Sequence, residues 1–274
     1  MQFLCGKKML LLICLVFSIL YAAIVTAAET IQLITQKDLP NNLGVYRHLQ
    51  IELEQPKGAV HLHVTTLNNN YQASFYQQTE ERQALAKFLD QLSQQEDFHV
   101  AINGGFYTHA FKAAGLFKLQ GNMLRPLARD RLLASCIGTD KNQKLLLGET
   151  RDSCMQQFSA MQTGPLLINH GKVNENLVLL EQNMPKSKAF FMDRRRTIIA
   201  KSNDDKILAI VTSAVRLTDI AYILQKYATA MGIKETVMAI DLDGGSSTGM
   251  YIRFAEQPFY YPELKHVKTM VFFN

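Results

Sequence analysis

Four short segments of this chain, three of which contain glycine, carry polar side chains in a way that a hydrophobic core does not require. They are residues 102–107, 162–165, 194–197 and 241–248. The first and last follow apolar, strand-like runs, so their polar groups are expected where a strand ends and the backbone turns, a common location for functional residues. Paired glycines there permit positive φ angles and let backbone amides approach an anion closely. Together the segments predict a site that receives an anion, although one glycine pair alone is typical of a tight turn.

Three other interpretations of residues 241–248 fail on their spacing. Asp241 and Asp243 after an apolar run resemble the nucleophile loop of haloacid dehalogenase-like phosphatases, but too few residues follow Asp243 to hold the rest of that fold. Residues 245–249 satisfy the G-x-S-x-G pattern of a serine hydrolase, yet no helix-forming run comes after them. A calcium-binding loop would need a glutamate where Ile252 stands.

In their order along the chain, the four segments resemble the phosphodiester glycosidase family. The family pattern runs Asn-Gly-Gly-Phe-Phe, then Thr-Gly-Pro, then Arg-Thr followed shortly by Gly, then Asn-Leu-Asp-Gly-Gly-Gly-Ser-Ser, which fall here on residues 103–107, 163–165, 196–197 and 241–248. The resemblance covers almost all of the mature chain. Three positions depart from the pattern, because Ala200 replaces the glycine after Arg-Thr, Asp241 replaces asparagine and Ser246 replaces the third glycine. A second carboxyl group two residues from Asp243 is expected to alter the pKa values of the site.

The resemblance implies a hydrolase that cleaves a sugar from a glycosyl phosphate or phosphodiester through an oxocarbenium-like transition state. The departing phosphate needs a fixed cation, and Arg196 is assigned to it because a guanidinium binds phosphate oxygens in a bidentate fork. Arg194 and Arg195 are expected to be solvated. Asp243 is expected to stabilise the positive charge on the sugar or to activate water, with Asp241 as the second candidate. The residues expected to bind sugar hydroxyls or phosphate oxygens are Asn103, Gly104, Gly105, Thr163, Gly164, Thr197, Gly244, Gly245, Ser246 and Ser247.

The elements that must position these residues are mostly strands. Alternating apolar and polar residues predict two strands, at 46–53 and 60–64, on either side of a turn near Pro56. Residues 206–215 and 236–242 also have the pattern of strands. His61 and His63 would share one face of the second strand. Without a third candidate ligand nearby, this face is expected to be solvated or hydrogen-bonded, and no metal ligands and no cofactor are assigned.

Two helices are predicted. The first begins after Thr79, which can cap it, and carries its apolar stripe from Leu85 to Leu92. The second runs from about Thr218 to Met231 and ends at Gly232. Many strands with only two clear helices favour an α+β fold, a single domain with a strand-rich mixed sheet and a few packing helices.

The composition is that of one globular domain. The chain has 274 residues, of which 47% are apolar and 19% are charged, and it contains no linker-like or repetitive tract. Its formal net charge of +5 includes Lys7 and Lys8 in the leader, and the remaining excess is too small to suggest a nucleic-acid partner.

Residues 1–28 have the layout of a signal peptide, and residues 29–274 are expected to form the mature domain. Lys7 and Lys8 precede a long apolar run, and small residues allow cleavage after Ala27 or Ala28. The predicted location is therefore periplasmic or secreted. The alternative is an uncleaved anchor, in which case the protein is attached to a membrane.

Cys136 and Cys154 are the two cysteines of the mature domain. In an oxidising compartment they are expected to form a disulfide, which would stabilise the fold by roughly 3 kcal/mol. The alternative is a pair of buried thiols.

The expected partner is a phosphorylated saccharide of the envelope or of an exopolysaccharide. Two other functions remain open. One is a non-catalytic envelope protein that binds carbohydrate in the same cradle, and the other is a structural protein whose glycine segments are only turns.

Overall fold

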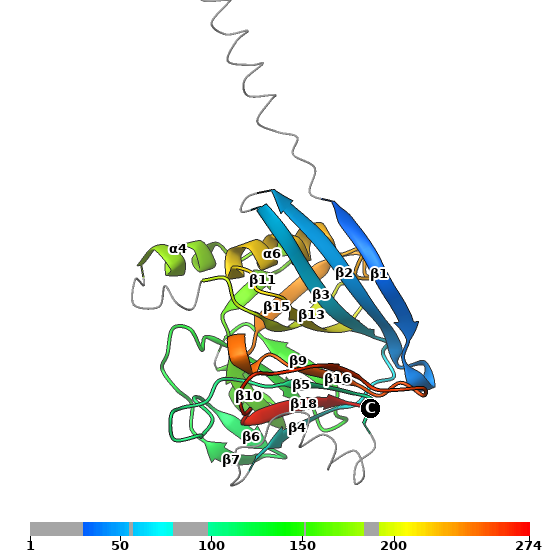
Figure 1. Ribbon diagram of the computed structural model, residues 1–274. Coiled ribbons are helices and arrows are strands. Elements are labelled where there is room, and N and C mark those ends of the chain that lie inside the picture. The colour runs from blue at the N-terminus through cyan, green and yellow to red at the C-terminus, as the bar shows by residue number, and fades with distance from the viewer. Residues whose placement is uncertain (1–29, 55–56, 79–97, 151, 184–191) are drawn as a thin grey trace, which may run out of the picture.

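The strands of this protein form three antiparallel sheets. The computed structural model describes residues 30–54, 57–78, 98–150, 152–183 and 192–274 (Figure 1). The eight-stranded sheet has the order β1 (Ile31–Asp38), β2 (Gly44–Glu54), β3 (Lys57–Leu67), β14 (Ile207–Thr212), β13 (Thr197–Ser202), β15 (Thr236–Asp241), β11 (Leu166–Asn169), β12 (Lys172–Val173). One five-stranded sheet has the order β7 (Asn122–Arg125), β6 (Phe117–Leu119), β10 (Ser159–Thr163), β8 (Ser135–Thr139), β9 (Leu145–Gly148). The other has the order β17 (Phe259–Tyr261), β16 (Met250–Ile252), β5 (Val100–Asn103), β18 (Thr269–Phe273), β4 (Ala73–Gln77).

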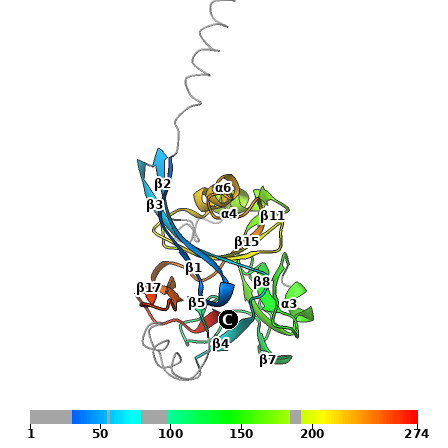
Figure 2. The same cartoon turned by 90° about the vertical axis from the view of Figure 1, so that its right-hand side faces the viewer.

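The helices within the described residues are short and lie at the periphery of the sheets. They are α3 (Ser153–Gln156), α4 (Glu175–Asn183) and α6 (Leu217–Lys226), with 3-10 turns η1 (Pro40–Asn42) and η3 (Gly245–Ser247). Helices α4 and α6 lie above the eight-stranded sheet, and the two five-stranded sheets lie below it (Figures 1 and 2). The strand-rich α+β fold predicted from the sequence is confirmed, although its described strand pairs are all antiparallel and none is parallel as in a mixed sheet.

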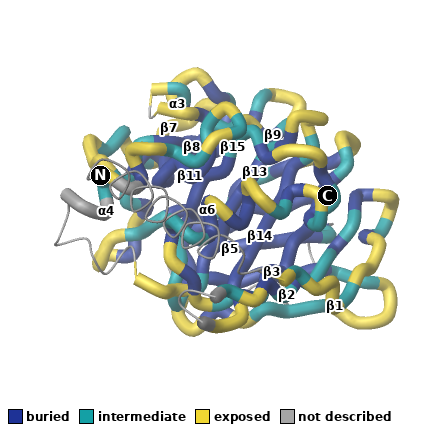
Figure 3. Tube along the Cα trace, turned by 90° about the horizontal axis from the view of Figure 1, so that it is seen from above, coloured by how far each residue is buried: buried dark blue, intermediate teal, exposed yellow. Residues whose placement is uncertain are grey.

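The central strand β14 is apolar up to its last residue, Thr212, because both faces of the eight-stranded sheet are covered there. In β14, Leu208 and Ile210 pack in the cluster that includes α6, while Ala209 and Val211 pack in the cluster shared with the five-stranded sheets. Figure 3 shows these buried strands at the centre, with exposed loops around the rim. Strand β1, at the sheet edge, is mostly exposed.

Strands β2 and β3 confirm the prediction made from alternating residues. They pair in antiparallel register with His48 opposite His63, so three histidines share the face that looks toward β17. His48 Nε2 lies 3.0 Å from His61 Nδ1, and the Tyr46 hydroxyl lies 2.7 Å from His63 Nδ1. Burial, with the nearby His48 and His61, lowers the pKa of His63 to about 3. Within the described residues no group of His, Cys, Asp and Glu is arranged to hold a metal ion.

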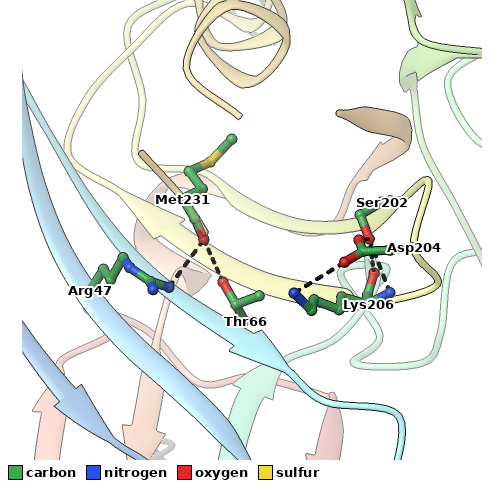
Figure 4. Close-up of polar contacts among 6 residues, drawn as sticks. All are labelled: Arg47, Thr66, Ser202, Asp204, Lys206 and Met231. Carbon is green, nitrogen blue, oxygen red and sulfur yellow. Dashed lines mark hydrogen bonds and ion pairs between the residues drawn. The ribbon is translucent and has the colours of Figure 1, made fainter. Parts of the chain in front are cut away.

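Helix α6 is shorter than the sequence predicted. It begins near the expected residue but ends at Lys226, and the chain then continues through turns to Gly232, whose φ is 85°. These turns bring the Met231 carbonyl oxygen within reach of two strands, where it accepts hydrogen bonds from Arg47 Nη1 at 3.3 Å and Thr66 Oγ1 at 2.6 Å (Figure 4). Tertiary hydrogen bonds therefore take over where the apolar helical pattern continues.

The predicted disulfide is not formed in this structure. Cys136, on β8, and Cys154, on α3, are both buried free thiols, and they pack in a small cluster with Leu116 and Ala160. A hydrogen bond with Cys154 and burial raise the pKa of the Cys136 thiol far above its usual value. The alternative interpretation, a pair of buried thiols, describes the structure.

Two sequence predictions lie outside the described residues. These are the leader, residues 1–28, and the helix expected between residues 79 and 92. None of the helices in the described part of the chain combines the length and the apolar character that crossing a bilayer requires.

Candidate active site

Three of the four polar segments meet at one end of the eight-stranded sheet, where the fourth reaches them from below. Thr197 begins β13 and Asp241 ends the neighbouring β15. On the other side of β15, the Gly164 amide donates to the Asp241 carbonyl oxygen at 3.1 Å. Asn103, at the end of β5, comes from a different sheet. The structure thus brings together segments that are far apart in the sequence.

Asn103 connects these segments through its side-chain amide. Its Oδ1 accepts hydrogen bonds from Thr197 Oγ1 at 2.6 Å and from the Gly249 amide at 3.0 Å, and its Nδ2 donates to the Asp243 carbonyl oxygen at 2.6 Å. The Asp243 amide in turn donates to the Gly104 carbonyl oxygen at 3.1 Å. Asn103 is only 1% exposed. It therefore holds the loop of Asp243 in place and does not face a ligand.

Several other predicted ligand-binding groups also have partners inside the protein. Thr163 Oγ1 donates to the Asp241 carbonyl oxygen at 2.9 Å. The Gly104 amide donates to Thr269 O, the Gly105 amide to Met161 Sδ, and the Gly245 amide to Arg195 O. A Cβ atom at Gly104 would lie 2.5 Å from Thr269 Oγ1, so this glycine is required for close packing. These backbone amides, which the sequence suggested as an anion-binding cradle, therefore donate to acceptors within the protein. Their hydrogen bonds help to fix the loop of Asp243.

Asp243 is the carboxyl group that this scaffold presents. It is partly exposed, and it lies two residues after Asp241, the last residue of β15. The dense surroundings raise the pKa of Asp243 to about 7, against the opposing effect of hydrogen bonds from the Ser247 hydroxyl and the Gly244 amide. Ser247 itself is buried in η3. A carboxyl group with this pKa exchanges a proton near neutral pH, which suits general acid–base chemistry.

Asp241 lies behind Asp243 and is fully buried. Its side chain is 0% exposed, and within the described residues neither carboxyl oxygen has a hydrogen-bond partner. Burial raises the pKa of Asp241 to about 8; Arg196 acts in the opposite direction, and Asp243 raises the value further. Asp241 is therefore largely a neutral carboxylic acid at pH 7, and it is not in a position to touch a substrate.

The three consecutive arginines have different environments. Those of Arg195 and Arg196 differ from what the sequence predicted. Arg196, expected to bind phosphate, is 2% exposed, and its guanidinium donates to Val215 O at 3.1 Å and Met192 O at 2.6 Å. Arg195, expected to be solvated, donates to Thr248 O at 2.8 Å and stacks on the ring of Tyr261.

Arg194 is exposed, as predicted, but it lies beside the site. Its backbone pairs with Val215, and its Nη1 would be 3.7 Å from a Cβ atom placed on Gly245, two residues after Asp243. The chain therefore presents a solvent-facing guanidinium next to the loop of Asp243. Sequence reasoning missed this because the Arg-Thr motif directed attention to Arg196.

A cavity of about 600 Å³ borders the same loop. It is lined by Tyr107, Thr108, His109, Phe111, Lys265 and His266. Ser246 joins it to the site, because its carbonyl oxygen accepts hydrogen bonds from the amides of Leu264 and Lys265 at 2.7 and 2.9 Å. Lys265 and His266 were not singled out from the sequence, where they stand outside the glycine segments. A volume of this size is typical of ligand pockets.

Comparisons with known proteins agree with this architecture. The family model described as phosphodiester glycosidase matches residues 96–273. A search of the curated proteins finds no match.

Two solved structures share the fold at low sequence identity. The catalytic domain of zebrafish N-acetylglucosamine-1-phosphodiester alpha-N-acetylglucosaminidase, auto-inhibited by its pro-peptide, has a TM-score of 0.64 and 15% identity over 92% of this chain and 89% of that chain. A hypothetical protein from Synechocystis has a TM-score of 0.66 and 14% identity over 90% of this chain and 64% of that chain.

Proposed function

Because the chain belongs to the phosphodiester glycosidase family, we propose that it is an exported hydrolase that releases a sugar from a glycosyl phosphodiester of the envelope or of an exopolysaccharide. The observation that carries this proposal is the position of Asp243. It is a partly exposed carboxyl group with a pKa near 7, fixed by Asn103 and Gly104 where the segments meet.

In the proposed reaction, Asp243 acts on the anomeric carbon or on the attacking water. The bond between the anomeric carbon and the phosphate oxygen breaks, and its electron pair leaves with the phosphate. The ionised carboxylate of Asp243 stabilises the positive charge that develops on the sugar, or it accepts the proton of the water that forms the new carbon–oxygen bond. The phosphate is a good leaving group, so no second carboxylic acid has to reach it.

Arg194 is the residue that we assign to the phosphate. Its guanidinium is exposed beside Gly245, whereas the guanidinium groups of Arg195 and Arg196 are engaged by carbonyl oxygens. A guanidinium binds phosphate oxygens through two parallel hydrogen bonds and compensates the charge that collects on the leaving group. This assignment replaces the role that the sequence suggested for Arg196.

Asp241 has a structural role in this proposal. It stands where the family pattern has asparagine, and its burial keeps it protonated at pH 7. A protonated carboxyl group has nearly the shape of a carboxamide and is also uncharged. Asp241 thereby fills the place of a neutral residue, and Arg196 lies close enough to interact with it electrostatically.

The test is hydrolysis of a panel of glycosyl phosphodiesters and envelope polymers by the purified protein. Released reducing sugar and the new phosphomonoester are measured together, since both must appear in equal amounts. The Asp243→Asn variant is expected to lose turnover by about 100-fold or more, the contribution of a general base. Asp204→Asn, on the β13–β14 turn (Figure 4), is the matched control and should retain full activity.

Two results would contradict the proposal. Equal activity of the Asp243→Asn variant and the unmodified protein would exclude Asp243 from the chemistry. Binding of the same compounds without release of sugar would favour a non-catalytic carbohydrate-binding protein.

A further inference from the structure

A second cavity, of about 580 Å³, shares no lining residue with the cavity at Tyr107 and Lys265. It is lined by residues that precede and begin β8, residues after β9, strand β11 and helix α4; Figure 2 shows where these elements lie. It borders the carboxyl site through Pro165, which lines it. The Pro165 carbonyl oxygen accepts a hydrogen bond from the Asp241 amide at 3.1 Å. The cavity is therefore one strand away from Asp241.

The lining contains two buried polar groups that the fold leaves without partners. Ser135 is 0% exposed, and within the described residues its hydroxyl group has no hydrogen-bond partner. The Oδ1 atom of Asn169 is also buried and has no hydrogen-bond partner within the described residues. Its Nδ2 donates to Glu149 Oε2 at 3.3 Å. An unpaired buried polar group costs about 1–3 kcal/mol, so such groups mark places where a ligand can form hydrogen bonds.

The remaining lining indicates the kind of ligand. Arg131 adds a positive charge, the Glu149 carboxylate is paired with His170 Nε2 at 3.2 Å, and Asn176 adds an exposed, uncharged polar side chain. Asparagine amides both donate and accept, as hydroxyl groups do. Leu166 and Leu179 add apolar surface, against which the C–H groups of a sugar ring can pack. This combination fits an uncharged, hydroxyl-rich molecule better than a phosphate.

We infer that this cavity is a binding subsite for an uncharged saccharide unit of the substrate. The inference deepens the proposed function, on which it rests in taking the ligand to be a carbohydrate. Two parts of one substrate then bind at different places. The phosphodiester binds near Asp243 and Arg194, and the neighbouring sugar units extend past Pro165 into the cavity. A substrate with several sugar units is therefore expected to bind more tightly than a single glycosyl phosphate.

The test measures binding apart from turnover. The Asp243→Asn variant, labelled with ¹⁵N, is titrated with uncharged oligosaccharides of increasing length and, separately, with inorganic phosphate, while backbone and asparagine side-chain amide signals are recorded. Uncharged oligosaccharides are expected to shift the Asn169 side-chain signals saturably, whereas inorganic phosphate is expected to shift only the signals near Arg194 and Gly245.

Substitutions at the rim then locate the ligand. Arg131→Ala and Asn176→Ala, which remove exposed side chains that line the cavity, should each weaken oligosaccharide binding about threefold to tenfold, the effect of losing one hydrogen bond. Asn142→Ala, at an exposed position in the turn between β8 and β9, is the matched control and should leave the affinity unchanged.

The outcomes separate this inference from the proposed function. Absence of saturable shifts at Asn169 with every oligosaccharide would overturn the subsite, as would shifts that persist unchanged in Arg131→Ala and Asn176→Ala. Hydrolysis of simple glycosyl phosphodiesters would still support the proposed function in that case. Saturable binding at Asn169 without any hydrolysis would support the subsite and contradict the enzyme.

Discussion

The substitution Asp241→Asn tests how the buried carboxyl group affects folding. Asparagine is the residue that the family pattern has at this position, and it has almost the same size as aspartic acid. The backbone contacts of residue 241, to Thr163, Gly164 and Pro165, do not involve its side chain. The variant therefore removes the ionisable group and changes little else.

The size and sign of the change in stability follow from the pKa of Asp241 in the unfolded chain and in the folded protein. Burial raises the pKa of Asp241 from 3.8 to about 8 in the folded protein. As the pH rises above 3.8, the unfolded chain loses this proton while the folded protein keeps it, so the unfolded state gains stability. The penalty grows by about 1.4 kcal/mol per pH unit and becomes constant above the folded pKa. Asparagine has no such penalty.

The measurement is urea unfolding of both proteins between pH 5 and pH 9. Between pH 5 and pH 7 the stability advantage of Asp241→Asn should grow by up to about 2.7 kcal/mol, and above pH 8 it should level off. Asp243 contributes a similar dependence to both proteins, so the difference isolates Asp241. Asp204→Asn serves as the control, because the pKa of Asp204 is lowered and this group is ionised throughout the range in both states.

A stability difference that is the same at every pH would refute this reasoning. It would mean that Asp241 is ionised in the folded protein, with Arg196 compensating its charge. A folded pKa below 3.8 would give the same flat result, because the carboxyl group would then be ionised in both states from pH 5 upward.

Four further predictions follow from the site and the sequence. Arg194→Ala should raise KM for a glycosyl phosphodiester about 10- to 100-fold, the effect of losing a charged hydrogen bond, and Arg194→Lys should restore part of it; an unchanged KM would remove this residue from the phosphate site. The value of kcat/KM should rise about tenfold per pH unit below pH 7 and then level off, because Asp243 must be ionised to act; a profile that falls across this range would assign it the role of an acid. Gly104→Ala should destabilise the protein by about 1–3 kcal/mol in urea unfolding, since its Cβ would overlap Thr269, whereas Gly58→Ala, where a Cβ meets nothing within 4 Å, should not. N-terminal sequencing of protein recovered from the periplasm or medium should begin at Ala28 or Glu29; an intact Met1 would favour an uncleaved anchor.

The local patterns of the sequence determined much of the fold. Period-two alternation predicted β2 and β3, and apolar runs predicted β14 and β15, because the side chains of a strand alternate between its faces whatever else the chain does. The order of the four polar segments was sufficient to indicate the family. Local signals also found the start of α6 but not its end, since the end depends on hydrogen bonds from Arg47 and Thr66 to Met231.

Only the tertiary structure decided which groups of the site are accessible. From the sequence, Asn103 and the glycine amides were candidates for binding substrate, but contacts such as Asn103 to Asp243, 140 residues apart, use them inside the protein. The sequence also did not distinguish Arg194 from Arg196, because the two have the same side chain and nearly the same position in the chain. Arg196 is buried, with the carbonyl oxygens of Val215 and Met192 accepting hydrogen bonds from its guanidinium, whereas Arg194 is exposed. Residue type determines what a group can do chemically, whereas burial and hydrogen bonding by distant segments decide whether it is free to do it.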